Sequence, residues 1–337
     1  MAATAEAIRT LTGADPRALP DDVLTSKQPV LLRGLIRDWP LVQAARRGAG
    51  EAIDYLRVQD RGAIVDVMVG PPAIDGRFFY NDDLSGFNFH RERAPLAAML
   101  DAMQRHLDDA SPPALYVGST TIDTALPALR ADNDVDLGAR DPLASIWIGN
   151  RTRIAAHQDV PDNLACVAAG RRRFTLFPPE QLANLYVGPI DFNPAGQAIS
   201  LVDFAAPDLA SYPRFAKALE HAIVVELDAG DAVFIPSLWW HHIEALDTFN
   251  VLVNYWWRRS PAWMDSPMNA LMLALMTIRD LPSTERDAWR DIFEHYVFAP
   301  DADTVDHIPP AARRVLAPLD AATARELRAR LLKRLNR

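Results

Sequence analysis

The sequence of 337 residues has only one cysteine, Cys166. A single cysteine cannot build an internal disulfide framework, so a small disulfide-stapled secreted fold is excluded. The lone thiol suits a reducing compartment, and we predict that the protein is cytoplasmic. Hydrophobic residues make up 49% of the chain, enough to bury a substantial core in one large domain with appendages or in two domains.

Long apolar runs and excess positive charge are also absent. No stretch is apolar for the length of a membrane span, and the N-terminus lacks the basic, apolar and cleavage-site succession of a secretory signal. The formal net charge is −9, which argues against a phosphate-binding surface. We therefore expect neither a membrane nor a nucleic acid as partner. The candidates for a local basic patch are Arg171–Arg173 and Arg258–Arg259.

Residues 114–260 have the texture of a β domain. Short apolar runs alternate there with Gly, Pro, Asn and Asp, a pattern typical of an all-β sandwich or barrel. The clearest predicted strands are Ser145–Gly149, Leu164–Ala168, Arg173–Phe177, Asp231–Ile235 and Asn250–Trp257. This segment is the predicted β core.

Residues 1–113 are predicted to be a mixed α/β part that packs on the β core. The pattern indicates a short helix and a loop up to Asp22, a strand from Pro29 to Ile36, and a helix with Pro95 at its first position.

Residues 261–337 are predicted to be helical. Apolar residues recur at helical spacing over 267–279, and a second helix follows with Ser283 as its expected N-cap. The first helix is apolar nearly all round, so one face of its own domain cannot cover it. We predict that this region is a homodimer interface; the alternative is a helix buried within its own subunit.

His157 and Asp159 are the first candidates for metal ligands. They lie two residues apart, a spacing that points both side chains to one face of a strand. An imidazole and a carboxylate can then converge on a single ion. The triplet taken alone is weak evidence, because a surface pair or a satisfied hydrogen bond gives the same pattern.

A pair of histidines strengthens the metal hypothesis. A buried run from Gly230 stops at Pro236, and two tryptophans then precede His241 and His242. Neighbouring strand residues point to opposite faces, so at most one of the two should reach the barrel interior. Two histidines and one carboxylate leave other positions on the ion open, as in non-haem iron oxygenases, whereas structural zinc sites are closed and thiolate-rich. The alternative is a histidine that only makes a hydrogen bond in the core.

Four motifs occur in the order found in one enzyme family. They are His157-Gln-Asp159-Val-Pro-Asp-Asn163, the stretch from Gly170 to Glu180, the stretch from Gly230 to Glu244, and Asn254-Tyr-Trp256. The series resembles the JmjC/cupin-8 family of Fe(II)- and 2-oxoglutarate-dependent oxygenases, and within it the subgroup of the asparaginyl hydroxylase that modifies hypoxia-inducible factor. The resemblance implies a mainly β fold with flanking helices, namely a double-stranded β-helix (cupin, jelly-roll) core with a C-terminal helical extension.

The resemblance also implies a metal site and a co-substrate site, residue by residue. The implied Fe(II) ligands are His157, Asp159 and His241. The implied contacts of 2-oxoglutarate are Tyr116, Asn163, Asn254 and, at its distal carboxylate, Arg172. No catalytic residue is implied beyond the metal ligands. Tyr80, Trp147 and Trp256 are expected near the site without a catalytic role.

Strand alternation is compatible with a buried Arg172, because Arg171 and Arg173 would then point outward. A buried guanidinium needs an anion, and a carboxylate is a suitable bidentate partner. The alternative is an arginine triplet on the surface. The chain departs from the family pattern with Arg172 in place of lysine and Ile154 in place of threonine, so a shorter or different acid is an alternative co-substrate.

The implied reaction is hydroxylation of a protein side chain or a small molecule, with release of succinate and CO2. Two other functions stay open. A metal-dependent cupin enzyme that does not use 2-oxoglutarate has no need for Arg172, and a non-catalytic cupin-fold binding protein needs no metal. The intact set of His157, Asp159 and His241 weighs against the second.

Overall fold

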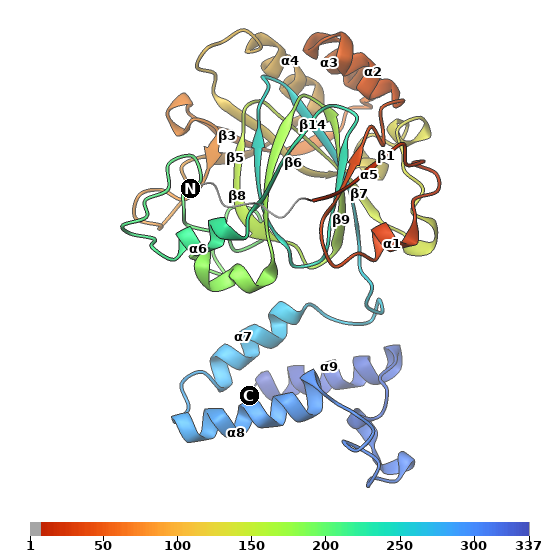
Figure 1. Cartoon of the computed structure of the whole chain (residues 1–337), viewed down its shortest axis with the longest axis vertical. Helices are drawn as coiled ribbons and strands as arrows, with labels where there is room; N and C mark the ends of the chain where they lie inside the picture. Colours follow the sequence, from red (N-terminus) through yellow and green to blue (C-terminus); the bar gives the residue numbers. More distant parts are fainter. Residues whose placement is uncertain (1–7, 337) are drawn as a thin grey trace. The chain divides into compact units, whose positions relative to one another are not determined.

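The computed structural model describes residues 8–336 and shows two compact units, which divide the sequence between Arg259 and Ser260 (Figure 1). The larger unit contains two β-sheets, and the smaller one is helical. Within residues 8–336, no helix is both long enough and apolar enough to cross a membrane.

Nine strands form the larger sheet, in the order β1-β2-β12-β9-β14-β7-β6-β3-β5. Their bounds are β1 (Arg9–Thr12), β2 (Val30–Arg33), β3 (Ile64–Gly70), β5 (His90–Pro95), β6 (Ala114–Thr121), β7 (Leu143–Gly149), β9 (Asp162–Ala169), β12 (Ala232–Ile235) and β14 (Asn250–Trp257). Five strands form the smaller sheet, in the order β11-β10-β13-β8-β4. Their bounds are β4 (Arg77–Phe78), β8 (Arg153–Gln158), β10 (Arg172–Phe177), β11 (Ile223–Leu227) and β13 (Trp240–Ala245). The predicted mainly β, jelly-roll fold is confirmed.

Strand β9 shows how side chains divide between two cores. Every residue of β9 is buried. Cys166 and Ala168 pack in the core that the larger sheet shares with the helices, whereas Ala165 and Val167 pack in the core shared with the smaller sheet. Because strand side chains alternate, Asn163 points to the same side as Ala165, into the space between the two sheets.

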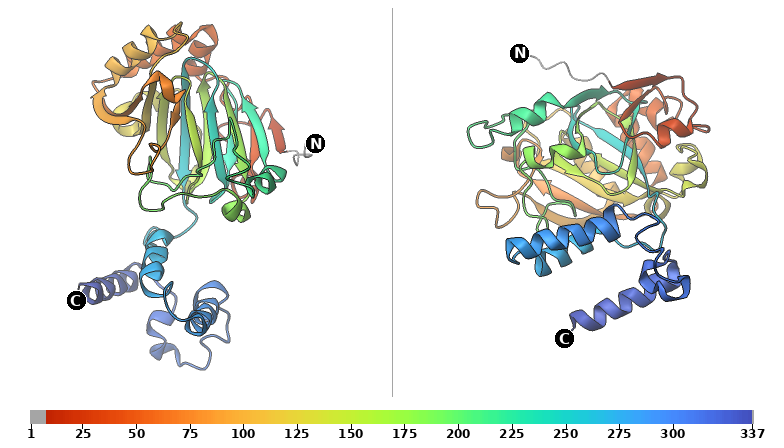
Figure 2. Two further views of the ribbon diagram at one scale, coloured as in Figure 1. Left: turned by 90° about the vertical axis from the view of Figure 1, so that its left-hand side faces the viewer. Right: turned by 60° about the horizontal axis from the view of Figure 1, so that its bottom comes forward.

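Helices cover the other face of the larger sheet (Figures 1 and 2). They are α2 (Pro40–Arg47), α3 (Ala49–Gln59) and α4 (Leu96–Arg105). Their apolar stripes contribute Leu41, Ile53 and Leu100 to that core. The other helices of this unit are short: α1 (Asp21–Leu24), α5 (Ile122–Ala125) and α6 (Phe215–Glu220). The space between the sheets is therefore lined by strand and loop side chains.

The structure corrects three local predictions. Residues 9–12, in a segment expected to be a helix and a loop, form β1, which pairs in parallel with β2; residues 1–7 lie outside the described part. Pro95 ends β5 and is the N-cap of α4, not its first residue. Ser283 is the first residue of α8, not its cap. Strand pairing and single-residue boundaries depend on tertiary contacts that local propensity does not contain.

The expected N-terminal part contributes strands as well as a covering layer. Strands β1 and β2 extend the larger sheet beyond β12, and β3 and β5 extend it beyond β6. Residues 8–113 and the β core therefore share one sheet.

The helical unit contains α7 (Pro267–Thr277), α8 (Ser283–Phe293), a π-helical turn (Glu294–Phe298) and α9 (Ala321–Leu335). Ser266 caps α7, and Asp320 and Thr323 form a capping box at α9. Among residues 260–336, only Thr304 and Ala324 have buried side chains. This unit therefore has almost no core of its own.

Candidate metal centre and adjoining cavity

Strands β8 and β13 bring two histidines together. The strands are antiparallel, and their register places His157 directly opposite His241. Directly opposed residues share one face of a sheet, and the two imidazole centroids are 4.2 Å apart.

Asp159 completes a three-residue cluster. It follows the last residue of β8, and its Oδ2 lies 3.6 Å from Nε2 of His241. One ligand atom from each of His157, Asp159 and His241 lies within 4.8 Å of the other two. Asp159 and His241 are buried and His157 is half-buried, so the cluster is shielded from bulk water but still accessible.

Each imidazole already uses one of its nitrogens. Nδ1 of His157 donates to the carbonyl of Ala155, and Nδ1 of His241 donates to the carbonyl of Trp239, both at 3.0 Å. A carbonyl oxygen only accepts, so each Nδ1 carries the proton and each Nε2 keeps a free lone pair. Such outer hydrogen bonds orient histidines that ligate a metal through Nε2.

Burial keeps His241 neutral. Desolvation, followed by repulsion from His157, lowers the pKa of His241 to about 4. At neutral pH a metal ion therefore does not have to displace a proton from Nε2. Two imidazoles and one carboxylate fit a divalent transition-metal ion, and with open positions this set is that of non-haem iron sites.

His242 points away from the cluster. Its ring stacks on Phe204 with centroids 4.5 Å apart, and it lies opposite Thr175 of β10. Strand alternation thus sends only one of the two histidines into the cluster, and this residue is His241, as the family resemblance implied.

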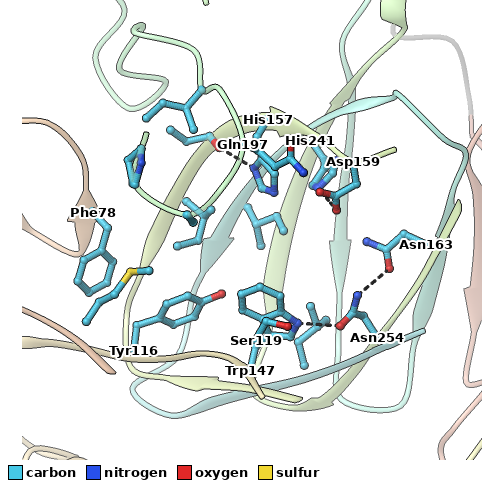
Figure 3. Close-up of a pocket in the computed structure, with 18 of the residues that line it drawn as sticks. Phe78, Tyr116, Ser119, Trp147, His157, Asp159, Asn163, Gln197, His241 and Asn254 are labelled. Atoms are coloured by element: carbon cyan, nitrogen blue, oxygen red, sulfur yellow. Dashed lines mark hydrogen bonds and ion pairs between the residues drawn. The ribbon is translucent and has the colours of Figure 1, made fainter. Parts of the chain in front are cut away.

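A cavity of about 280 Å³ adjoins the cluster, and His157, Asp159 and His241 form part of its wall (Figure 3). Other wall residues include Phe78, Tyr116, Trp147, Asn163, Gln197 and Asn254. Most of these come from strands of the larger sheet, so the cavity lies between a wall that can hold a metal and a wall of polar and aromatic groups.

Asn163 and Asn254 meet on the inner face of neighbouring strands β9 and β14. Nδ2 of Asn254 donates to Oδ1 of Asn163 at 3.3 Å, and Oδ1 of Asn254 accepts from Nε1 of Trp147 at 2.7 Å. Figure 3 shows both bonds. The structure thus brings two of the predicted co-substrate residues together beside the cluster.

Arg172 is a buried cation next to this cavity. It is 1% exposed and does not line the cavity wall, but its guanidinium interacts with the hydroxyl of Tyr116, which does line the wall. Burial lowers the pKa of Arg172 and raises the pKa of Tyr116 to about 12. Nε and Nη2 of Arg172 have no hydrogen-bond partner within the described chain. A buried guanidinium with unused donors is a suitable place for an anion.

The neighbouring arginines point outward, as strand alternation predicted. Arg171 pairs with Asp247, and Arg173 pairs with Glu226. These ion pairs, and that of Arg259 with Asp162, neutralise most of the basic patch considered from the sequence.

Several expected neighbours of the site can now be placed. Ile154, Trp147 and Trp256 line the cavity. Tyr80 does not; its hydroxyl donates to the carbonyl of Phe192 at 2.5 Å. The apolar Ile154 offers no hydroxyl to a ligand.

Sequence reasoning missed the contribution of one long loop. Between β10 and β11, the loop carries Pro194, Ala195, Gln197 and Ile199 to the cavity wall. No periodic pattern marks such a segment, because its path depends on packing against Tyr80 and Ala155 instead of on its own spacing.

A two-sheet jelly roll with two histidines and one carboxylate beside an inter-sheet cavity defines a protein of the cupin class. Residues 16–262 match the family model described as the cupin-like domain. The chain belongs to this family, and the family predicted from the motif order is confirmed. The asparaginyl hydroxylase subgroup stays a prediction.

Curated relatives include a demethylase and a hydroxylase. Lysine-specific demethylase JMJ31 of Arabidopsis thaliana is 37% identical over 132 residues, which are 37% of this chain and 24% of that protein. The tRNA wybutosine-synthesizing protein 5 of Danio rerio is 39% identical over 106 residues, 32% of this chain and 29% of that protein. The human bifunctional peptidase and (3S)-lysyl hydroxylase JMJD7 is 26% identical over 266 residues, 70% of this chain and 79% of that protein. The match thus spans 24% and 29% of the first two relatives.

Proposed function

We propose that this protein is an Fe(II)- and 2-oxoglutarate-dependent oxygenase that hydroxylates its substrate. The observation that carries the proposal is Arg172, a buried guanidinium that has no ion-pair partner among the described residues and lies next to a cavity-lining tyrosine. The same cavity is lined by a candidate metal cluster. A keto acid that chelates a metal at one end and carries a carboxylate at the other would use both features.

His157 and His241 would hold the iron through Nε2, and Asp159 through its carboxylate. When bound, iron and 2-oxoglutarate together would supply dioxygen activation and oxidation of a substrate C–H bond, with release of succinate and CO2.

The chain's own residues would position the acid and exclude water. Arg172 and Tyr116 would bind the distal carboxylate of the acid. Asn163 and Asn254 would contact the other end of the acid, beside the metal. The apolar side chain of Ile154, which lines the cavity, would help to exclude water from it. No side chain is required as a general base.

A protein side chain is the substrate class that we favour, with a small molecule as the alternative. A cavity of about 280 Å³ is small for a ligand site, so beside the co-substrate it has room only for the tip of a larger substrate. The lysyl hydroxylase and the lysine-specific demethylase among the relatives are named for chemistry on such side chains.

Anaerobic titration of the purified protein with Fe(II) and then with 2-oxoglutarate, followed by a succinate assay in air, tests the proposal. The wild type should bind one equivalent of each and release succinate when air is admitted. Asp159→Ala and His241→Ala should each weaken iron binding about 100-fold or more, since each removes one of three ligands.

The adjacent His242 offers a matched control. His242→Phe keeps a ring against Phe204 and should bind iron as the wild type does. Iron binding that stays unchanged in both ligand variants contradicts the metal site.

A cupin enzyme that uses its metal without 2-oxoglutarate is the second candidate. Ile154 favours it, because the hydroxyl contact expected with the co-substrate is missing there. If the wild type binds iron but not 2-oxoglutarate, the result supports this second candidate function. Binding of neither selects a non-catalytic cupin-fold module.

A further inference from the structure

Trp147, Asn254 and Asn163 form a hydrogen-bond relay whose direction is fixed by chemistry. An indole N–H can only donate. The Asn254 atom that lies 2.7 Å from Nε1 of Trp147 must therefore be the amide oxygen. The amide nitrogen of Asn254 then faces Asn163 at 3.3 Å, and the Asn163 atom that accepts from it must also be an amide oxygen.

The relay ends in the NH2 group of Asn163, which is a hydrogen-bond donor. With its oxygen bonded to Asn254, Asn163 turns its NH2 group toward Asp159 and the cavity (Figure 3). Asn254 is 1% exposed and Asn163 is 6% exposed, so little bulk water competes for these amides. Oxygen and nitrogen of a side-chain amide have nearly the same shape, so without the indole N–H either amide could turn over.

We propose that Trp147 is a positioning residue that fixes Asn163 as a hydrogen-bond donor toward an oxygen anion bound beside the metal. The inference rests on the proposed function for the identity of that anion, a carboxylate of 2-oxoglutarate. A fixed NH2 group stabilises a carboxylate, whereas an amide oxygen in its place repels it. The direction of the relay therefore selects an anionic ligand.

The packing of Trp147 allows the N–H group to be tested apart from the ring. The indole stacks on Tyr116 and meets Trp256 edge-on, with ring centroids 5.9 Å and 5.8 Å away. Trp147→Phe keeps an aromatic ring there and removes the donor. Trp257→Phe is the matched control, because the buried Nε1 of Trp257 has no hydrogen-bond partner in the described structure.

The first measurement uses metal-free protein labelled with ¹⁵N-asparagine. Side-chain amide signals are assigned by their loss in Asn163→Ser and Asn254→Ser. The wild type should give one signal set for each amide. Trp147→Phe should shift or double both sets, and Trp257→Phe should leave them unchanged. Unaltered signals in Trp147→Phe overturn the relay.

The second measurement is calorimetric titration with Mn(II), followed by 2-oxoglutarate. Trp147→Phe should keep Mn(II) affinity within about 2-fold and lose about 10-fold or more in affinity for the acid, as expected when one hydrogen bond to a charged group is lost. Retained affinity for the acid, or a matching loss of Mn(II) affinity, overturns the positioning role. A wild type that binds Mn(II) and not the acid overturns the proposed function, while the amide signals still decide the relay.

Discussion

Arg172 is the residue on which the co-substrate depends. Its guanidinium is buried and interacts with the hydroxyl of Tyr116, and its Nε and Nη2 have no hydrogen-bond partner among the described residues. Arg172→Ala should therefore weaken 2-oxoglutarate binding about 100-fold or more, since removal of one partner of a buried charge pair costs about 3 to 5 kcal/mol. Metal binding should be spared. Calorimetry on the metal-loaded protein measures both.

Two variants control for charge and position. Arg172→Lys keeps a cation but loses the forked donor, and we expect a loss of about 10-fold. Arg171→Ala removes an outward side chain that pairs with Asp247, so its binding of the acid should match the wild type. If Arg172→Ala and the wild type bind the acid equally, the results favour a metal-dependent cupin enzyme that does not use 2-oxoglutarate.

Cys166 provides a single-site reporter of folding. It lies in the buried strand β9, and burial raises the pKa of its thiol. The thiol is therefore protonated at pH 8 and shielded, and we predict that a disulfide reagent reacts with the folded protein about 1,000-fold more slowly than with the protein in urea. Absorbance of the released thiolate follows the reaction. Rapid labelling of the native protein contradicts the burial of β9.

The turn between β9 and β10 connects the strand that carries Asn163 to the strand that carries Arg172. Gly170 in this turn has φ +70°, and a Cβ there would lie 2.5 Å from the carbonyl oxygen of Phe249. Gly170→Ala should lower the free energy of unfolding by more than about 2 kcal/mol, because strain in the left-handed region adds to a backbone clash. Urea unfolding measures the change.

Gly13→Ala is the control for strain alone. Gly13 has φ +75°, and nothing lies within 4 Å of its added Cβ. It should cost only about 1 kcal/mol. Equal losses in the two variants show that the close approach at Gly170 is not important.

The C-terminal unit carries an exposed apolar surface. Met276 is 68% exposed and Phe298 is 72% exposed, and α7 contains no charged residue. Helices of 11 residues such as α7 and α8 are marginal alone, so their stability must come from packing. We propose that a second copy of the chain covers this surface, because a two-fold contact lets an uncharged, methionine-rich face pack against its own copy.

Light scattering at micromolar concentration tests the homodimer. The full chain should be dimeric, and both Met272→Glu with Met276→Glu and a chain that ends at Arg259 should be monomeric. Val58→Glu alters a side chain that is 71% exposed on α3 and should stay dimeric. A monomeric full-length protein rules out the interface.

The resemblance of the sequence to a known family predicted the fold class, the family and the set of His157, Asp159 and His241, which the structure brings together. Alternation in a strand is a local property, so the two-residue spacing of His157 and Asp159 and the opposite directions of His241 and His242 could be read without a structure. Compartment and oligomeric state stay predictions.

Contacts between groups that are distant in the sequence could not be predicted without the structure. Trp147 and Asn254 come from strands far apart in the chain, and their bond depends on the register of β7 against β14. The loop that carries Gln197 to the cavity has no periodic pattern, and β1 is a strand because β2 offers it a partner. The alternation of side chains along a strand is a local property of neighbouring residues. Strand register and loop path depend on packing contacts across the whole chain, so no short segment of sequence determines them.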